Sequence, residues 1–530
     1  MTRRATWAWL ALGALAFAAG CWLRFQQIGA QIVIDDEWHA LHKVLRSDLL
    51  GIVTHLDYAD YSIPLTVYFR ALYDTVGITE WGMHLPMLAA GLALVAAGPW
   101  LVRDWTAPAV RATWTVLLAL SPLLVYVSRT ARPYAIIALT TTVALVAFER
   151  WWRGQGRSRG WATAYVVATF IGGYLHMICL AFTLLPFVYF GAVARADRAA
   201  LVRLVRLGLV TAVPLAIALL PPLINDWFMF TAKAGVDSVT ADSAWRTLLV
   251  LAGTAHAAIA LAFLLCAAVG IARWWKRDRL LAGYVLVVTG GGALAIVAAR
   301  PNWVQYPIVF ARYLVPVLPL MLLLAAEGLV TLTPMRSRVL HAACIALVAA
   351  AWWAAGPLPA QLAAPNQFTG HLRYQFEYDD ARNPYVTLRP DEPVPAFYRE
   401  LARAPAGSLT LIEAPWRLES HFNPLAWYQQ VHRQNVKIGL TTPLCGVRDF
   451  GEYPESAQGI RLANFVHLQS VLRREATGAD FLVMHLRPWS TPPGQDVPWP
   501  DVAGCLPAIE QALGAPVYRD DAIVVFALKP

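Results

Sequence analysis

Residues 6–28, TWAWLALGALAFAAGCWLRFQQI, form a predominantly apolar stretch, and the residues that follow at 29–37, GAQIVIDDE, end in three consecutive carboxylates. A stretch of this length can cross the roughly 30 Å hydrocarbon core of a bilayer as a helix. Charged groups beside a membrane span are costly to desolvate, so they usually face water, a pore or a substrate. The two features together predict a membrane protein with chemistry at one membrane face.

The composition of the whole chain agrees with that prediction. Of its 530 residues, 58% are hydrophobic and 15% are charged, whereas soluble domains carry about a quarter charged residues. The mean hydropathy is +0.48. The net charge of +9 comes from short basic clusters between apolar stretches. This pattern indicates membrane topology and contact with membrane lipids, and no nucleic acid partner is expected.

About eleven apolar stretches can be read as membrane-spanning helices. They lie at roughly 6–28, 84–102, 107–127, 133–149, 161–175, 177–194, 207–224, 247–272, 280–299, 313–333 and 339–356. With Arg3 and Arg4 in the cytoplasm, the basic clusters between the spans also fall inside, as the positive-inside rule requires. The loop at 29–83 and everything after about 357 then lie outside. We expect a bacterial inner (cytoplasmic) membrane protein whose C-terminal domain is periplasmic or extracellular.

The sequence changes character at about residue 357, after which no stretch has membrane length. Short apolar stretches at 409–413, 436–440, 480–485 and 522–527 alternate with helical patterns near 424–434, 460–475 and 505–513. The alternation predicts a small α/β domain with a Rossmann-like outline. No Gly-x-Gly-x-x-Gly follows its first strand, so nucleotide binding is not supported. We therefore expect a polytopic α-helical membrane domain, 1–356, and an external soluble α/β domain, 357–530.

The six cysteines divide between the two expected domains. Four of them, Cys21, Cys179, Cys266 and Cys344, lie in predicted spans, where they serve as small apolar packing residues. Cys445 and Cys505 lie in the external domain, where an oxidising compartment would permit a disulfide bond. No Cys/His spacing suggests a zinc site, and no Ser/His/Asp arrangement is legible.

Two arginines stand in a very short outer turn, SRTARPY at 128–134, against the positive-inside trend. Arg129 and Arg132 either reach the lipid headgroups along their aliphatic stems or bind an anionic lipid phosphate through their planar guanidinium groups. A third external arginine, Arg312 in FARY at 310–313, precedes a helix rich in Leu and Pro. It could join the same phosphate site.

The motifs at the outer ends of the spans occur in an order and spacing that resemble one family. They are Asp36-Glu37 after the first span, Ser121-Pro122 followed by the 128–134 turn, Tyr174-Leu175-His176, and Arg312-Tyr313-Leu314 with Pro316 and Pro319. These motifs look like those of the GT-C glycosyltransferases. Within that superfamily the chain is most similar to the branch containing dolichyl-phosphate-mannose-protein mannosyltransferases and bacterial aminoarabinose transferases. The resemblance covers roughly residues 1–335.

The resemblance implies a lipid-linked sugar donor, a catalytic external carboxylate and a soluble C-terminal domain whose role varies in the family. It does not identify the sugar. The chain departs from the family in two places. His84-Leu85-Pro86 stands where many relatives have Arg before Leu-Pro, and 61–64 reads YSIP instead of a His-Pro-Pro pattern. These departures put donor contacts from the upstream loop in doubt.

The chemistry can also be argued from the residues. In a glycosyl transfer from a polyprenyl phosphate, an acceptor hydroxyl or amine attacks the anomeric carbon and a carboxylate can serve as general base. We favour Asp36 as base, with Glu37 positioning a neighbour and Asp35 as a further candidate. Negative charge grows on the departing phosphate, where Arg129, Arg132 or Arg312 could stabilise it. One direct displacement would invert the anomeric configuration.

The aromatic and imidazole groups near these arginines are candidates for substrate binding, namely Tyr134, His176 and Tyr313. Each candidate has a structural alternative. The three carboxylates could cap a helix that begins near Trp38, and His176 could be an interfacial histidine at a helix end. The sequence requires no cofactor and shows no fuller metal-ligand set. A divalent ion held by Asp35, Asp36 and Asp57 or Asp60 is the alternative, because hard cations prefer oxygen ligands.

Two other classes of protein compete with the transferase. A transporter or lipid flippase also uses many helices and buried charges, but it usually places its ionisable groups near the bilayer midplane. A membrane scaffold would leave the Asp and Arg motifs unexplained. The acceptor, whether protein, lipid or glycan, is not identified by the sequence.

Overall fold

The computed structural model describes residues 3–33, 36–57, 62–359, 393–415, 425–446, 452–488 and 499–529. The chain divides into two compact units. The helical unit comprises 1–26, 48–67 and 84–358, and the mixed unit comprises 27–47, 68–83 and 359–530. Most of the predicted outer loop at 29–83, namely its parts within 27–47 and 68–83, therefore folds together with the C-terminal α/β region.

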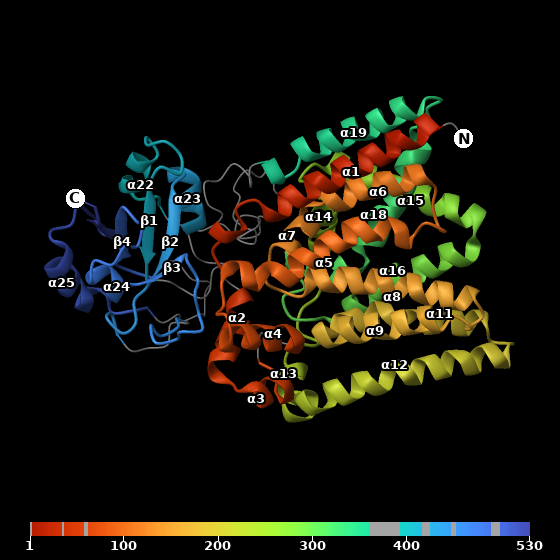
Figure 1. The fold of residues 1–530 in the computed structure, drawn as a ribbon, viewed down its shortest axis with the longest axis horizontal. Coiled ribbons are helices and arrows are strands. Elements are labelled where there is room, and N and C mark those ends of the chain that lie inside the picture. Colours follow the sequence, from red (N-terminus) through yellow and green to blue (C-terminus); the bar gives the residue numbers. More distant parts are fainter. Residues whose placement is uncertain are drawn as a thin grey trace. The chain divides into compact units, whose positions relative to one another are not determined.

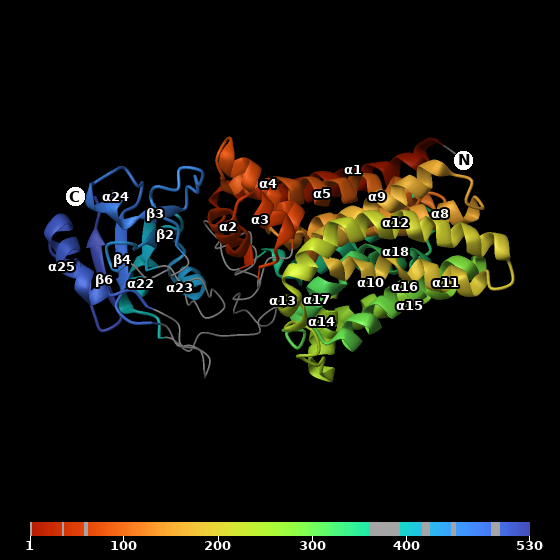
Figure 2. The same cartoon turned by 90° about the horizontal axis from the view of Figure 1, so that it is seen from below.

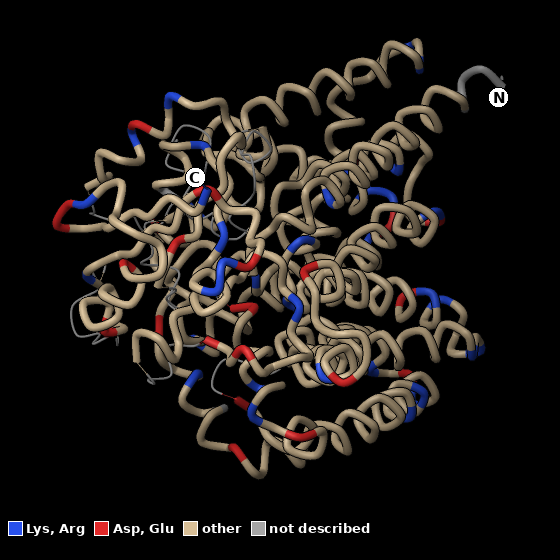
Figure 3. The backbone as a smooth tube through the Cα atoms, turned by 60° about the vertical axis from the view of Figure 1, so that its left-hand side comes forward, with Lys and Arg blue, Asp and Glu red and all other residues tan. Residues whose placement is uncertain are grey.

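The described chain up to residue 359 is mainly helical, and its long helices run side by side in both views (Figures 1 and 2). The helices are α1 (Arg3–Phe25), α2 (Asp36–Arg46), α3 (Leu49–Thr54), α4 (Ile63–Asp74), α5 (Glu80–Leu101), α6 (Pro108–Leu120), α7 (Pro122–Ser128), α8 (Tyr134–Arg153), α9 (Arg159–Leu175), α10 (Leu180–Thr183), α11 (Leu185–Val193), α12 (Arg198–Asn225), α13 (Trp227–Thr231), α14 (Ala241–Ala252), α15 (Ala257–Arg277), α16 (Arg279–Ala299), α17 (Pro307–Leu314), α18 (Leu318–Leu332) and α19 (Arg338–Ala354). Charged residues gather near the ends of the long helices and are sparse in between (Figure 3).

Among the described residues, seven helices are long and apolar enough to cross a membrane, or eight if α6 and α7 form one span bent by 58°. The protein is thus an integral membrane protein. The expected number of about eleven spans is not confirmed. Helices α9 and α19 have 17 residues each, which is short against the roughly 20 residues of a usual span. The stretch at 177–194 is divided among the 3-10 turn Met177–Cys179, α10 and α11.

The single helix predicted over 247–272 is wrong, because the structure has two helices there, α14 and α15. The break lies at Gly253, whose φ of 67° falls in the left-handed region. Glycine adopts this conformation without steric cost and commonly ends helices. A Cβ at this position would also lie 2.5 Å from Cδ of Pro122. The apolar run continues through the break, so hydropathy alone hides it.

Helices α15 and α18 pack with their backbones very close together. A Cβ on Gly270 would overlap the carbonyl group of Leu324, and a Cβ on Gly328 would overlap that of Cys266. Membrane helices lack a hydrophobic driving force for association, so small residues at the interface supply close packing instead. These two glycines set the approach of the helices.

The C-terminal α/β region contains a six-stranded sheet in the order β3-β2-β1-β4-β6-β5. Its strands are β1 (Thr410–Ala414), β2 (Asn435–Leu440), β3 (Phe465–His467), β4 (Phe481–His485), β5 (Tyr518–Arg519) and β6 (Ile523–Ala527). The first four are parallel, whereas β6 is antiparallel to both β4 and β5. The arrangement confirms the predicted α/β domain, and four strands lie where the apolar stretches placed them.

The helices beside these strands are α22 (Ala396–Leu401), α23 (Leu425–His432), α24 (Leu468–Leu472) and α25 (Val502–Leu513). Helices α23 and α25 match the predicted patterns. The helix predicted over 460–475 is wrong at its start, because β3 occupies Phe465–His467 and only the short α24 follows. Strands β3 and β5 are too short to show a recognisable alternation of apolar and polar residues in the sequence. They are strands because they pair with β2 and β6, respectively.

Candidate functional site

The acidic residues after the first span lie at the start of α2, in the mixed unit. Asp36 and Glu37 occupy its first turn, where negative charge is favoured by the helix dipole. Glu37 is only 1% exposed, and Asp36 is half-buried. The third predicted carboxylate, Asp35, lies outside the described residues. The helix begins two residues earlier than predicted, so Asp36 and Glu37 form part of the helix itself.

The aromatic and cationic candidates in the helical unit come together. The guanidinium carbon of Arg312 lies 5.7 Å from the centre of the Tyr134 ring. The rings of Tyr134 and His176 are 5.8 Å apart, and those of His176 and Tyr313 are 6.3 Å apart. We call these four residues the arginine–aromatic cluster. They come from the start of α8, the end of α9 and the last turn of α17, so three helix ends meet here.

Local sequence explains why these helices end where they do. Pro307 opens α17, and its fixed φ and missing amide hydrogen suit the first turn of a helix. The 3-10 turn Val315–Val317, which follows α17 directly, packs against α8. Pro133 occupies the cap position before Tyr134. Pro307 and Pro133 thus fix where α17 and α8 begin, and the turn after α17 holds its last turn, which carries Arg312, against α8.

The other predicted arginines have different surroundings. Arg129 is 2% exposed, and its Nη1 donates to the carbonyl oxygens of Leu23 and Gln26 at 2.8 and 2.9 Å. These bonds satisfy carbonyls at the end of α1 and give Arg129 a structural role. Arg132 is 8% exposed. It stands two residues before Tyr134, so its Cα lies within about 7 Å of the Cα of that residue.

His176 also has a structural contact. It ends α9, and its Nδ1 accepts a hydrogen bond from the backbone N–H of Ile178 at 3.3 Å. A neutral imidazole with an accepting Nδ1 carries its proton on Nε2. His176 thus caps the 3-10 turn and still presents an N–H donor on its other nitrogen. The structural and functional interpretations are compatible.

A buried arginine that the sequence analysis missed lies inside the first span. Arg24 is 1% exposed. Its Nη1 and Nη2 donate to the carbonyl oxygens of Ala119 and Leu118 at 3.1 and 3.2 Å, and its Nε donates to Oγ of Ser128 at 3.2 Å. Pro122 has no amide hydrogen to offer Leu118, so Arg24 satisfies a carbonyl freed by the bend between α6 and α7. A charge within an apolar stretch was the available signal.

In the part of the chain that it describes, the structure does not show a set of ligands for the divalent ion that was considered as an alternative. Among the described residues, no group of three or more His, Cys, Asp or Glu could hold a metal ion. Asp57 is half-exposed in the segment after α3. Asp35 and Asp60, the other residues named for such a site, lie outside the described residues.

The mixed unit contains a buried polar cluster at the carboxyl ends of β1 and β4. Glu413 Oε2 accepts a hydrogen bond from the Tyr398 hydroxyl at 2.8 Å and lies 2.9 Å from Nε2 of His485. All three side chains are at most 3% exposed. Burial and the adjacent Glu413 carboxylate hold the pKa of Tyr398 well above its usual range. Strands β1 and β4 flank the point where the strand order reverses, a common ligand position in such sheets. No pattern in the sequence predicted that Glu413, Tyr398 and His485 lie together.

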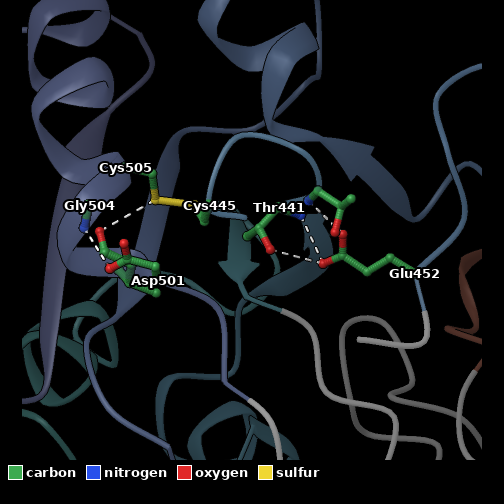
Figure 4. Close-up of a disulfide and its surroundings, with 8 residues drawn as sticks. Thr441, Cys445, Glu452, Asp501, Gly504 and Cys505 are labelled. Atoms are coloured by element: carbon green, nitrogen blue, oxygen red, sulfur yellow. Dashed lines mark hydrogen bonds between the residues drawn. A yellow bond between two sulfur atoms is a disulfide. The ribbon is translucent and has the colours of Figure 1, made fainter. Parts of the chain in front are cut away.

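Cys445 and Cys505 form a disulfide bond with a Cα–Cα distance of 4.9 Å. Figure 4 shows the bond beside a second set of contacts, in which Glu452 accepts from the backbone N–H groups of Thr441 and Thr442. Burial raises the pKa of Glu452 even though these hydrogen bonds favour its charged form. The disulfide bond joins the segment after β2, which contains Cys445, to α25, which contains Cys505.

The sequence matches no protein-family model and no curated protein. The chain is similar in fold to several solved structures, among them the following three. ArnT from Cupriavidus metallidurans bound to undecaprenyl phosphate shares 16% identity over 97% of this chain and 98% of its own, with a TM-score of 0.48. AglB, an oligosaccharyltransferase from Archaeoglobus fulgidus in complex with an inhibitory peptide and a dolichol-phosphate, shares 12% identity over 90% and 69%, with a TM-score of 0.45. Arabinofuranosyltransferase AftD from Mycobacteria shares 14% identity over 100% and 42%, with a TM-score of 0.44. These neighbours are GT-C membrane glycosyltransferases.

Proposed function

We propose that this protein is an inverting glycosyltransferase that moves a sugar from a polyprenyl-phosphate donor to an acceptor at the external membrane face. The observation that carries the proposal is the arginine–aromatic cluster of the helical unit. Arg312 is 7% exposed and faces the ring of Tyr134. Enclosed guanidinium groups suit phosphate recognition, and aromatic rings offer apolar faces to a sugar.

The proposed roles follow from charge. Asp36 removes a proton from the acceptor as it attacks the anomeric carbon, and Glu37 positions a neighbouring group. The bond between the anomeric carbon and the phosphate oxygen breaks in the same step, and the electron pair leaves with the phosphate. Arg312 stabilises that developing negative charge on the phosphate. Arg132, which stands two residues before Tyr134, contributes to the same stabilisation. A single displacement of this kind inverts the anomeric configuration.

The Cys445–Cys505 disulfide supports an external position for the mixed unit. Disulfides form and persist in oxidising compartments such as the periplasm and the cell surface. An alkaline phosphatase fused after Pro530 should therefore be active. An inactive fusion together with an active cytosolic reporter would contradict the proposed orientation.

The direct test uses the full chain in proteoliposomes. Mass spectrometry of lipids that co-purify with the protein first bounds the prenyl chain and sugar. Undecaprenyl-phosphate sugars are then supplied, and release of undecaprenyl phosphate is measured together with the anomeric configuration of the product. Transfer with inversion supports the proposal. Movement of intact donor lipid across the bilayer without its consumption would identify a flippase instead.

The role of Asp36 is tested by Asp36→Asn, which keeps size and removes basicity. Loss of a general base typically lowers the rate about 10²–10⁴-fold, whereas Asn is a good residue at a helix N-terminus. The matched control is Asp74→Asn, an equal change at a carboxylate whose side chain is 48% exposed. We expect a severe loss of transfer for the first variant and nearly normal transfer for the second. Normal transfer by Asp36→Asn would remove Asp36 from the mechanism.

The phosphate contact is tested by Arg312→Lys, which keeps the charge and removes the planar fork. We expect weaker donor dependence and slower turnover. Arg246→Lys is the control, because its side chain is 50% exposed on α14. Equal activity of the two variants would refute the assignment of Arg312.

A further inference from the structure

The segment that carries Asp36 and Glu37 is bound to the C-terminal α/β region within the mixed unit. Helix α2 has 11 residues, and an isolated helix shorter than about 12–15 residues is only marginally stable in water. Its order must therefore come from the residues that it packs against. Those residues belong to a part of the chain roughly 400 positions away.

The first attachment is Trp38, the residue directly after the acidic pair. Its side chain is fully buried. The indole ring stacks on Tyr453 with centroids 5.7 Å apart and meets the edge of Phe465 at 5.0 Å. Its Nε1 donates to the carbonyl oxygen of Val33 at 2.9 Å. One side chain thus ties the chain on both sides of the acidic residues to the start of β3.

The second attachment involves the segment before α5 and the first residue of that helix, Glu80. The backbone of Ile78 donates to Gly459 O and accepts from Arg461 N, both at 2.7 Å, as in a parallel strand pair. Glu80 is 3% exposed, and its Oε1 accepts from the backbone and side-chain nitrogens of Asn464 at 3.0 and 3.1 Å. Hydrogen bonds to a buried carboxylate are stronger than neutral ones.

The two attachments share one short stretch of the C-terminal region. Asn464 is next to Phe465, and its side-chain nitrogen also donates to Gly29 O at 3.3 Å. Tyr453 is enclosed as well, and burial with the nearby Glu80 and Glu452 carboxylates raises its pKa. The stretch 453–465 therefore contacts the loop before α2, α2 itself, the segment before α5 and the first residue of α5.

We infer that the C-terminal α/β region positions the acidic turn of α2, with Trp38, Tyr453 and Asn464 as positioning residues for the carboxylate of Asp36. This inference rests on the proposed function. The residues are not catalytic, because they act through the orientation of α2. With a rise of 1.5 Å per residue, Asp36 lies only about 3 Å along the helix from Trp38, so a shift of the indole moves the carboxylate.

The kinetic test compares Tyr453→Ala with Tyr453→Phe in the full chain. The alanine variant removes the ring under Trp38, and the phenylalanine variant retains it. Because a displacement of about 1 Å can cost about 10²-fold in rate, we expect a loss of this order in kcat for Tyr453→Ala. KM for the donor should change much less, since the arginine–aromatic cluster is untouched. Tyr453→Phe should restore the rate.

The matched structural control is Ile509→Ala. Ile509 is fully buried in the hydrophobic core cluster of the same region, and that cluster includes no residue of α2. It should lower stability without lowering kcat. If it reduces kcat as much as Tyr453→Ala does, the effect is general destabilisation and the inference is overturned. An unchanged kcat in Tyr453→Ala would overturn it equally.

Hydrogen exchange of the amides in 36–46 provides a readout that does not need turnover. Tyr453→Ala, and Asn464→Ala at the second attachment, should speed exchange there by at least about tenfold, which corresponds to 1.4 kcal/mol. Ile509→Ala should not. If the wild-type protein transfers no sugar, the proposed function fails while this measurement still judges the attachment. Unchanged exchange in both variants would overturn the inference even in an active transferase.

Discussion

Arg24→Met should destabilise the helical unit, because it removes the donor that satisfies two carbonyls at the bend between α6 and α7. Met has nearly the volume of the Arg stem, so packing is largely retained. The bonds lost include those to Leu118 and Ala119 at 3.2 and 3.1 Å, the bond to Ser128 and a bond to the carbonyl oxygen of Gly20 at 3.1 Å. The carbonyl groups would remain in an apolar interior.

The size of the effect follows from those groups. Each orphaned buried acceptor costs about 1–3 kcal/mol, so two carbonyls amount to roughly 2–6 kcal/mol. Relief of the cost of burying the guanidinium acts in the opposite direction. We therefore expect a net loss of about 2 kcal/mol or more. Unfolding of the full chain in mixed micelles, followed as a function of denaturing detergent, measures this difference.

A second substitution separates this account from a loss of packing. Pro122→Ala restores an amide hydrogen four residues after Leu118. In the Arg24→Met background it should recover about 1 kcal/mol, so the two changes should not be additive. If Arg24→Met unfolds within about 0.5 kcal/mol of the wild type, Arg24 does not satisfy these carbonyls in the way described.

Three further outcomes are expected. Cys505→Ser should lower the free energy of unfolding of the mixed unit by about 2–4 kcal/mol, because its partner Cys445 is 60 residues away in sequence. Denaturant unfolding measures this difference, and equal stability of wild type and variant would contradict the prediction. Burial lowers the pKa of His432 to about 3, below the value near 6.5 in the unfolded chain. The folded state thus binds fewer protons than the unfolded state at this site, and the free energy of unfolding should fall by about 2 kcal/mol between pH 7 and pH 5. His432→Gln should flatten this pH dependence. An unaltered pH profile in the variant would show that another group is responsible. Gly328→Ala should reduce thermal stability markedly, because the added Cβ would overlap the backbone carbonyl of Cys266. The control Gly290→Ala should be tolerated, because no atom lies within 4 Å of the Cβ it would add. Equal tolerance of the two variants would argue against the close packing of α15 and α18.

The sequence by itself determined the class of the fold. Backbone that crosses a bilayer must satisfy its own hydrogen bonds, which favours helices for apolar stretches of membrane length. Hydropathy therefore predicted a helical membrane protein, although not the number of spans. The strands β1, β2, β4 and β6 were likewise predicted from local pattern, because short apolar stretches between turn signals are typical of buried strands. The proximity of Tyr134, His176 and Arg312 was suggested only by the order of motifs at span ends.

Tertiary structure decided where the helices break and which segments belong together. The break at Gly253 lies inside a continuous apolar run, and the carbonyl groups at the bend between α6 and α7 accept hydrogen bonds from Arg24 of another helix. The pairing of Arg24 with this bend is not visible from the local sequence pattern. Likewise, residues 29–47 were predicted as part of an external loop, yet they fold with a region hundreds of residues later. Trp38 and Asn464 make contacts that no periodicity encodes, because such pairings depend on the packed fold and not on neighbouring sequence.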